Sequence, residues 1–112
     1  MNLKYDLDRY IAMHGGKVTL KVIFYLIFTQ EVWAVVIFRF GSFCSKLKIP
    51  VFGFLLRFVW FFLNKTIEIL TGISISANAR IGKGLFIGHF GGIFINESVI
   101  IGDNLTIAQG VT

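Results

Sequence analysis

Cysteine, proline and acidic residues are scarce in this 112-residue chain, which contains one Cys, one Pro and six Asp or Glu. The single cysteine, Cys44, excludes a disulfide framework within the chain, and its apolar neighbours indicate a buried, unreactive thiol. No basic and apolar targeting segment opens the sequence, because charged residues at positions 4, 6, 8 and 9 precede the first apolar run. These absences predict a reducing, cytoplasmic setting.

Two kinds of site are missing from the sequence as well. The His and Cys residues do not occur at spacings that bind a metal, so we expect no metal cofactor. Gly82 and Gly84 do not form a phosphate-binding loop, because they recur as corner residues of a repeat described below.

Apolar residues are abundant instead: the chain is 55% hydrophobic, contains 13 Phe and has a mean hydropathy of +0.77. The net charge of +5 lies in residues 32–67, which hold five Lys or Arg and no Asp or Glu. Basic charge interleaved with aromatic rings predicts peripheral contact with an anionic surface, such as the inner face of the bacterial membrane. The high hydropathy and the lack of a recognition motif argue against a nucleic-acid partner.

Residues 1–72 are predicted to form a helical region. We expect a short helix over 7–13 and two aromatic-rich helices over 18–43 and 49–63, which pair as a hairpin. Charged side chains interrupt each apolar run before it reaches the roughly 18 residues of a membrane-spanning helix. Two interpretations of the hairpin stay open. It lies at a membrane interface, with re-entrant insertion as the lesser variant, or its aromatic side chains form the core of an oligomer.

An aliphatic residue recurs at every sixth position in the last third of the chain. The positions, with two extra residues between the third and the fourth, are Ile75, Ile81, Ile87, Ile95, Ile101 and Ile107. A period of six fits neither a helix nor an ordinary strand, but it fits a coiled parallel β-solenoid in which each hexad is one strand and one corner. The alternative is two or three ordinary strands with Gly-rich turns.

Three stretches of the sequence resemble the serine O-acetyltransferase family of hexapeptide-repeat acyltransferases. They are ARIGKGLFIGHFGG (79–92), VIIGDNLTIAQGVT (99–112) and Phe38-Arg39-Phe40-Gly41. The resemblance implies an α+β chain, with N-terminal helices (1–72) followed by a left-handed parallel β-helix (73–112) that assembles into homotrimers. On this model 75–92 and 95–112 are two coils, and the later coils of the family are absent, so we expect a truncated β-helix.

The resemblance assigns the general base to His89. In the family, this histidine takes the proton of an acceptor hydroxyl while the oxygen attacks the thioester of acetyl-CoA, the co-substrate. Imidazole suits this role because its ordinary pKa of about 6.5 lets it accept and return a proton near neutral pH. Gly88, Gly91 and Gly92 leave room for a substrate beside it. The alternative is a corner histidine with no catalytic task.

The sequence departs from the family at two positions that bear on the acceptor. Serine-using members carry an aspartate just before the histidine and a carboxylate fifteen residues upstream, where this chain has Gly88 and Ser74. Glu97 falls where the family also has a glutamate, and it is the nearest carboxylate in sequence that can orient the His89 ring; a solvated corner glutamate is the alternative. The Gly-His-Phe-Gly-Gly motif resembles the branch of the family that acetylates polysaccharides, of the colanic-acid type.

We therefore predict an acetyl-CoA-dependent O-acetyltransferase that acts on a saccharide hydroxyl in surface-polysaccharide biosynthesis. One alternative is a serine O-acetyltransferase of cysteine biosynthesis. The other is an inactive remnant that only oligomerises or binds a membrane. The coils end at Thr112 without a polar cap, so we expect either a fragment of a longer chain or an end that partner subunits cover.

Overall fold

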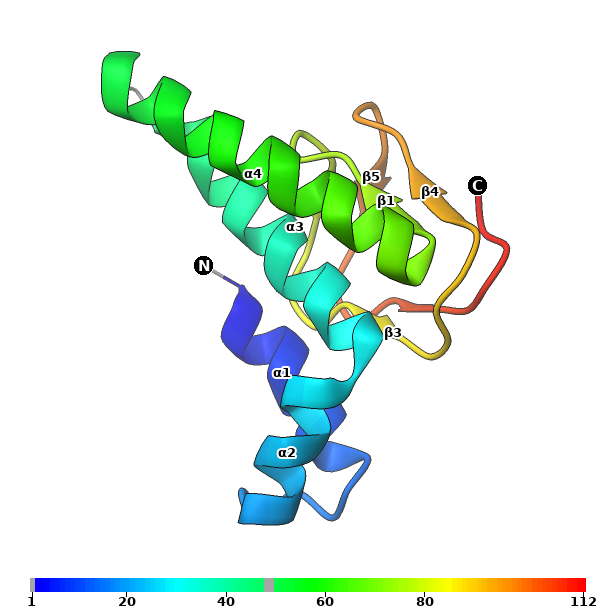
Figure 1. Ribbon diagram of the computed structural model, residues 1–112. Helices are drawn as coiled ribbons and strands as arrows, with labels where there is room; N and C mark the ends of the chain where they lie inside the picture. Colours follow the sequence, from blue (N-terminus) through cyan, green and yellow to red (C-terminus); the bar gives the residue numbers. More distant parts are fainter. Residues whose placement is uncertain (1, 48–49) are drawn as a thin grey trace.

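A computed structural model describes residues 2–47 and 50–112 and shows helices followed by short parallel strands (Figure 1). This confirms the predicted α+β order. The helices are α1 (Leu3–Ala12), α2 (Leu20–Phe28), α3 (Gln30–Lys46) and α4 (Pro50–Thr71). The strands are β1 (Ile73–Ile75), β2 (Arg80–Ile81), β3 (Phe86–Ile87), β4 (Ile93–Ile95), β5 (Ile100–Ile101) and β6 (Thr106–Ile107).

The prediction of one continuous helix over 18–43 is wrong, because the chain bends by 73° between α2 and α3. Thr29 has an extended backbone at the bend, with φ −91° and ψ 120°, and its hydroxyl donates to the carbonyl of Tyr25. The indole of Trp33 donates to the carbonyl of Ile27, near the end of α2. Side-chain bonds to the last carbonyls of a helix satisfy groups that would otherwise lack partners, so they stabilise the bend.

The predicted hairpin corresponds to α3 and α4, which pack side by side (Figure 1). Gly41 allows the close approach, because a side chain at this position would collide with the ring of Trp60. The Trp60 indole donates to the carbonyl of Ile37 at 3.0 Å. Lys48 and Ile49, the predicted start of the second helix, lie outside the described residues.

Helix α4 continues eight residues beyond its predicted end at residue 63. Lys65 and Glu68 form an ion pair at 3.6 Å on its last turns. The helix stops at Gly72, whose φ of +70° is the left-handed conformation common after a helix end, and whose N–H bonds to Glu68. Gly72 leads directly into β1.

The six strands form three parallel pairs, β1 with β4, β2 with β5 and β3 with β6. Each residue pairs with the one twenty positions later, as in Ile73 with Ile93 and Ile87 with Ile107. The chain therefore passes through three strand positions in residues 73–92 and through the same positions again in 93–112. Five of the six hexad isoleucines are buried and Ile101 is partly buried. The left-handed sense of the coils stays a prediction.

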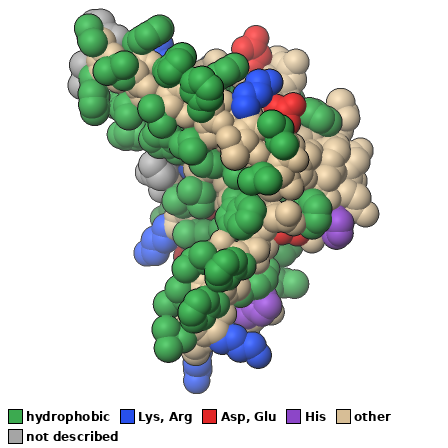
Figure 2. Space-filling model, viewed as in Figure 1, with side chains coloured by type: hydrophobic (Ala, Val, Ile, Leu, Met, Phe, Trp, Pro, Cys, Tyr) green, Lys and Arg blue, Asp and Glu red, His purple; other side chains and the backbone are tan. Residues whose placement is uncertain are grey.

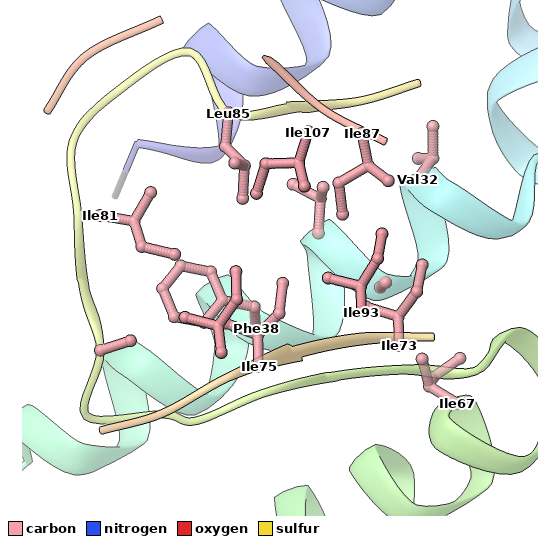
Figure 3. Close-up of a cluster of buried hydrophobic side chains, with 14 of the residues drawn as sticks. Val32, Phe38, Ile67, Ile73, Ile75, Ile81, Leu85, Ile87, Ile93 and Ile107 are labelled. Atoms are coloured by element: carbon pink, nitrogen blue, oxygen red, sulfur yellow. The ribbon is translucent and has the colours of Figure 1, made fainter. Parts of the chain in front are cut away.

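One hydrophobic core joins the helices to the coils. Val32 and Phe38, both of α3, point into the space between the strands, where the isoleucines converge (Figure 3). Tyr10 of α1 and Ile67 of α4 belong to the same cluster. The helices thus close the end of the first coil.

A buried ion pair fastens this closure. The Arg39 guanidinium donates to both carboxylate oxygens of Asp6, at 2.6 and 2.9 Å, and to the carbonyls of Ile81 and Gly82. Asp6 also accepts from the backbone N–H of Gly84 and Leu85. Side chains from two helices therefore supply hydrogen bonds to the exposed edge of the first coil, the edge that a sheet must cover or pair.

Among the described residues, no single helix is long and apolar enough to cross a bilayer. The bent pair formed by α2 and α3 satisfies the length and composition criteria when taken together.

Candidate functional site

The segment around His89 forms the corner between β3 and β4, residues 88–92. Gly91 and Gly92 adopt φ values of +108° and +63°, which a side chain disfavours. A Cβ on Gly72 would approach the backbone of both glycines at 3.1 Å. The corner is therefore built by backbone packed against backbone, and it leaves His89 exposed to solvent.

His89 contacts its neighbour Phe90 in two ways. Its Nδ1 lies 2.7 Å from the Phe90 carbonyl oxygen, and the two rings stack with centroids 5.0 Å apart. Because a carbonyl only accepts, Nδ1 must carry the proton in this bond. In the neutral ring, Nε2 is then the free acceptor, which is the state that a general base requires.

Helix α1 fixes strand β3, which precedes this corner. The Tyr10 hydroxyl accepts from the Ile87 N–H at 2.8 Å and donates to the Ile87 carbonyl at 3.2 Å. Burial raises the pKa of Tyr10, so the phenol stays protonated and keeps both bonds. Arg9 donates to the carbonyls of Gly84 and Leu105 and to the Thr106 hydroxyl, and so joins both coils beside β3. Asp6, Arg9 and Tyr10 could not be identified from the sequence, since their partners in the coils lie 75 to 97 residues away.

The structure brings together four of the six predicted site residues. Gly88, His89, Gly91 and Gly92 share the corner after β3. Glu97 lies exposed in the corner after β4, and no ion pair or hydrogen bond within the described parts of the chain joins it to His89. The role of Glu97 in orienting the ring stays a prediction, and the contact that orients the ring here is the Phe90 carbonyl.

Ser74 lies half-buried in β1, where it pairs with Phe94 of β4. It borders a hollow of about 570 Å³ that is lined mainly by residues of the second coil, among them Phe94, Ile101 and Leu105. The lining is largely apolar because the inward side chains of the second coil are uncovered on this side. Asn96 and Thr106 add polar groups at its edge.

A cleft of about 700 Å³ lies between α3 and the strand β2. Lys46 and Arg80 line it, together with the amide of Asn78 and the hydroxyl of Ser42, whereas Arg39, which also lines it, is already paired with the Asp6 carboxylate. Such a lining can hold an anionic group. The sequence does not reveal this cleft, because its residues come from four separate segments.

Metal ligation and thiol chemistry find little support in the described ranges, 2–47 and 50–112. Within them, no group of three or more His, Cys, Asp or Glu side chains is placed to hold a metal ion. Cys44 is buried as predicted, and this burial raises the pKa of its thiol. A thiol with a raised pKa is a weak nucleophile at neutral pH.

No family model matches this chain, but part of it is similar to curated proteins. The serine acetyltransferase of Staphylococcus aureus (strain Mu50) is 50% identical to this chain over 50 residues, which cover 45% of this chain and 24% of the relative. The serine acetyltransferase of Staphylococcus epidermidis (strain RP62A) gives the same figures. The matched segment thus spans about a quarter of the length of these curated relatives.

Proposed function

We propose that the protein is an acetyl-CoA-dependent O-acetyltransferase in which His89 is the general base. The observation that carries this proposal is the bond from His89 Nδ1 to the Phe90 carbonyl, because it leaves Nε2 as an exposed acceptor. The similarity to serine acetyltransferases supports the same reaction class. No metal enters the proposal, because the chemistry needs only a base and an activated acyl donor.

The reaction follows from the position of Nε2. The imidazole Nε2 removes the proton from the acceptor hydroxyl as its oxygen forms a bond to the thioester carbonyl carbon of acetyl-CoA. The C–S bond then breaks, and the imidazolium returns its proton to the leaving thiolate. The products are the acetyl ester and free CoA. Gly88, Gly91 and Gly92 carry no side chains, so the acceptor can approach the ring closely.

We propose L-serine as the acceptor, in place of the saccharide that the sequence analysis predicted. The support is the similarity to serine acetyltransferases, which favours the alternative given there. A saccharide hydroxyl remains a second candidate on one observation: Gly88 and Ser74 stand where the serine-using members of the family carry carboxylates. Residues 88–92 themselves are Gly, His, Phe, Gly and Gly, so none of them supplies a carboxylate.

The remaining features belong to the same proposal. We propose that the coils wind in the left-handed sense, that 1–72 and 73–112 act as a helical and a coil domain, and that three copies assemble around the coils. We propose a cytoplasmic location. The support is the resemblance of 79–92 and 99–112 to the hexapeptide-repeat family.

The test measures free CoA thiol released by the complete protein from acetyl-CoA, with L-serine and with nucleotide or lipid-linked sugars as acceptors. We expect release with serine, and a loss of about 10²- to 10⁴-fold in His89→Ala. His14→Ala is the matched control, since His14 is the other histidine of the chain and its ring lies against the ring of Tyr25 of α2. Full activity of His89→Ala would show that the base is assigned wrongly. Release only with sugars would reverse the choice of acceptor, and no release with any acceptor would leave the inactive remnant as the correct description.

A further inference from the structure

Helix α4 exposes apolar side chains over more than half of its circumference. From Val51 to Leu63, the only charged residue is Arg57. At about 100° of rotation per residue, the exposed apolar positions cover an arc of about 200°. These positions are Val51, Phe52, Phe54, Leu55, Phe58, Val59, Phe61, Phe62 and Leu63.

A second apolar surface lies on α2, and an apolar hollow adjoins it. Leu20, Ile23, Phe24, Ile27 and Phe28 are exposed on α2. The hollow, of about 430 Å³, is lined only by apolar side chains: Leu7, Leu26, Ile27, Val32, Trp33, Val36, Ile37 and Ile67. These come from all four helices. Figure 2 shows hydrophobic side chains gathered over both α4 and α2 on one face of the molecule.

Cations border this surface. Lys46 is exposed on the last turn of α3, Arg57 lies at the edge of the apolar arc, and Lys65 lies on α4 beyond it. The Arg57 guanidinium reaches the carbonyl of Leu47 at 3.4 Å, so its charge sits at the end of α4 that Lys46 also approaches. Because residues 32–67 carry no carboxylate, the charge beside the apolar surface is of one sign.

We propose that the exposed faces of α2 and α4, with the hollow between the helices, form a docking face for an anionic lipid bilayer. The side chains of α4 enter the acyl region while the helix lies in the plane of the interface, and the bordering cations contact acidic headgroups. Long basic side chains beside an apolar arc can extend to the headgroup level while their stems stay in the apolar layer. This inference does not depend on the proposed reaction.

A second copy of the chain is the competing occupant, and two observations favour the bilayer. A packed partner helix covers a stripe of about 100°, so it would leave nearly half of the α4 arc exposed, whereas a bilayer surrounds the helix to the depth at which it lies. A second copy would also place cations opposite cations, because α2 and α4 carry a single carboxylate, Glu68, which pairs with Lys65. An anionic surface matches the charge that is present.

The experiment is vesicle flotation of the protein, synthesised without detergent in the presence of phosphatidylcholine vesicles with or without phosphatidylglycerol. We expect flotation with the anionic vesicles, which weakens at high salt and without phosphatidylglycerol. Phe58→Gln with Phe62→Gln should lower the floating fraction roughly tenfold, because both rings are about half exposed, at 55% and 56%. Ile100→Gln is the matched control: Ile100 is 76% exposed but lies on β5, away from the docking face.

A fluorescence measurement separates insertion from loose adsorption. Trp60→Phe leaves Trp33, which lines the hollow, as the one tryptophan of the chain. Acyl-brominated lipid in the anionic vesicles should quench Trp33 fluorescence. The proposal is overturned if the protein does not float with the anionic vesicles, whether it stays in solution or sediments as it does when vesicles are absent. A second outcome also overturns it: the wild type does not float, and the Phe58/Phe62 variant has a different oligomeric mass from the wild type by light scattering. In that case a second copy of the chain occupies the surface.

Discussion

Replacement of Asp6 by Asn tests how the helices hold the coils. Asp6 is fully buried, and Arg39 is 4% exposed. The carboxylate accepts bonds from Arg39 and from the N–H groups of Gly84 and Leu85. Asn keeps the size of the side chain but removes its charge. The NH₂ group of its amide would also face at least one of the N–H groups that now donate to the carboxylate, so that two donors would meet.

The cost of this change follows from the burial of the pair. Removing one partner of a buried ion pair leaves an uncompensated charge, which costs about 3–5 kcal/mol. Domains of this size are stable by about 5–15 kcal/mol, so the variant loses a large part of its free energy of unfolding. Asp8→Asn, on the same helix but exposed, should change it by no more than about 0.5 kcal/mol.

Urea unfolding followed by circular dichroism measures both variants. A double variant, Asp6→Leu with Arg39→Met, removes both charges, so we expect it to be more stable than the two single variants predict by addition. If Asp6→Asn unfolds at the same urea concentration as Asp8→Asn, the ion pair does not fasten α1 and α3 to the first coil. An additive double variant would show that the two side chains act independently.

Two further predictions concern the helices. Gly41→Ala should lower the free energy of unfolding by about 1–3 kcal/mol in thermal unfolding, because its Cβ would collide with Trp60. Gly53→Ala should be neutral or stabilising, because its Cβ would meet mainly the flexible end of Arg57. Equal effects of the two substitutions would contradict the close contact of Gly41 with Trp60. Burial raises the pKa of Tyr10, so the folded chain binds this proton more tightly than the unfolded chain, in which Tyr ionises near pH 10. The contribution of Tyr10 to the free energy of unfolding is therefore complete below about pH 10 and is lost as the pH rises further. Above about pH 10, the urea midpoint of the wild type should fall more steeply with pH than that of Tyr10→Phe. Parallel plots of midpoint against pH would refute the raised pKa of Tyr10.

The sequence predicted the coil region because its signal is local and repeated. Isoleucines at every sixth position give each strand one inward side chain, and the observed register of Ile75 with Ile95 and Ile81 with Ile101 follows from that spacing. The two extra residues, Ile93 and Phe94, take part in the pairing as well, since β1 and β4 begin two positions before the first isoleucine of their hexads.

The helical region was harder to predict for two reasons. Its bend depends on single side-chain hydrogen bonds, and its attachment to the coils depends on contacts between residues far apart in the sequence. Nothing in the apolar run 18–43 distinguishes the bend at Thr29 from a continuous helix, because the bend depends on side-chain bonds of Thr29 and Trp33. The partners of Asp6 and Tyr10 in the coils lie 77 to 79 residues away, and residue spacing carries no information at that distance.

The candidate site shows the same division. Its glycines and His89 were predicted from the motif at 88–92, and the structure places them in one corner. The bond that selects the tautomer of His89 depends on the carbonyl direction of Phe90, which the corner geometry determines. His89 and Glu97 fall in successive hexads, and the structure accordingly places them at different corners.

The most direct test of the central claim is the tautomer of His89, read from the ¹⁵N chemical shifts of its ring in the folded protein at a pH of about 9, where imidazole is ordinarily neutral. The signals are assigned with His14→Ala, which leaves His89 as the one histidine of the chain. The account predicts a protonated Nδ1 and an unprotonated, acceptor Nε2. A protonated Nε2 would contradict it, because the exposed nitrogen then has no lone pair with which to take a proton from an acceptor hydroxyl.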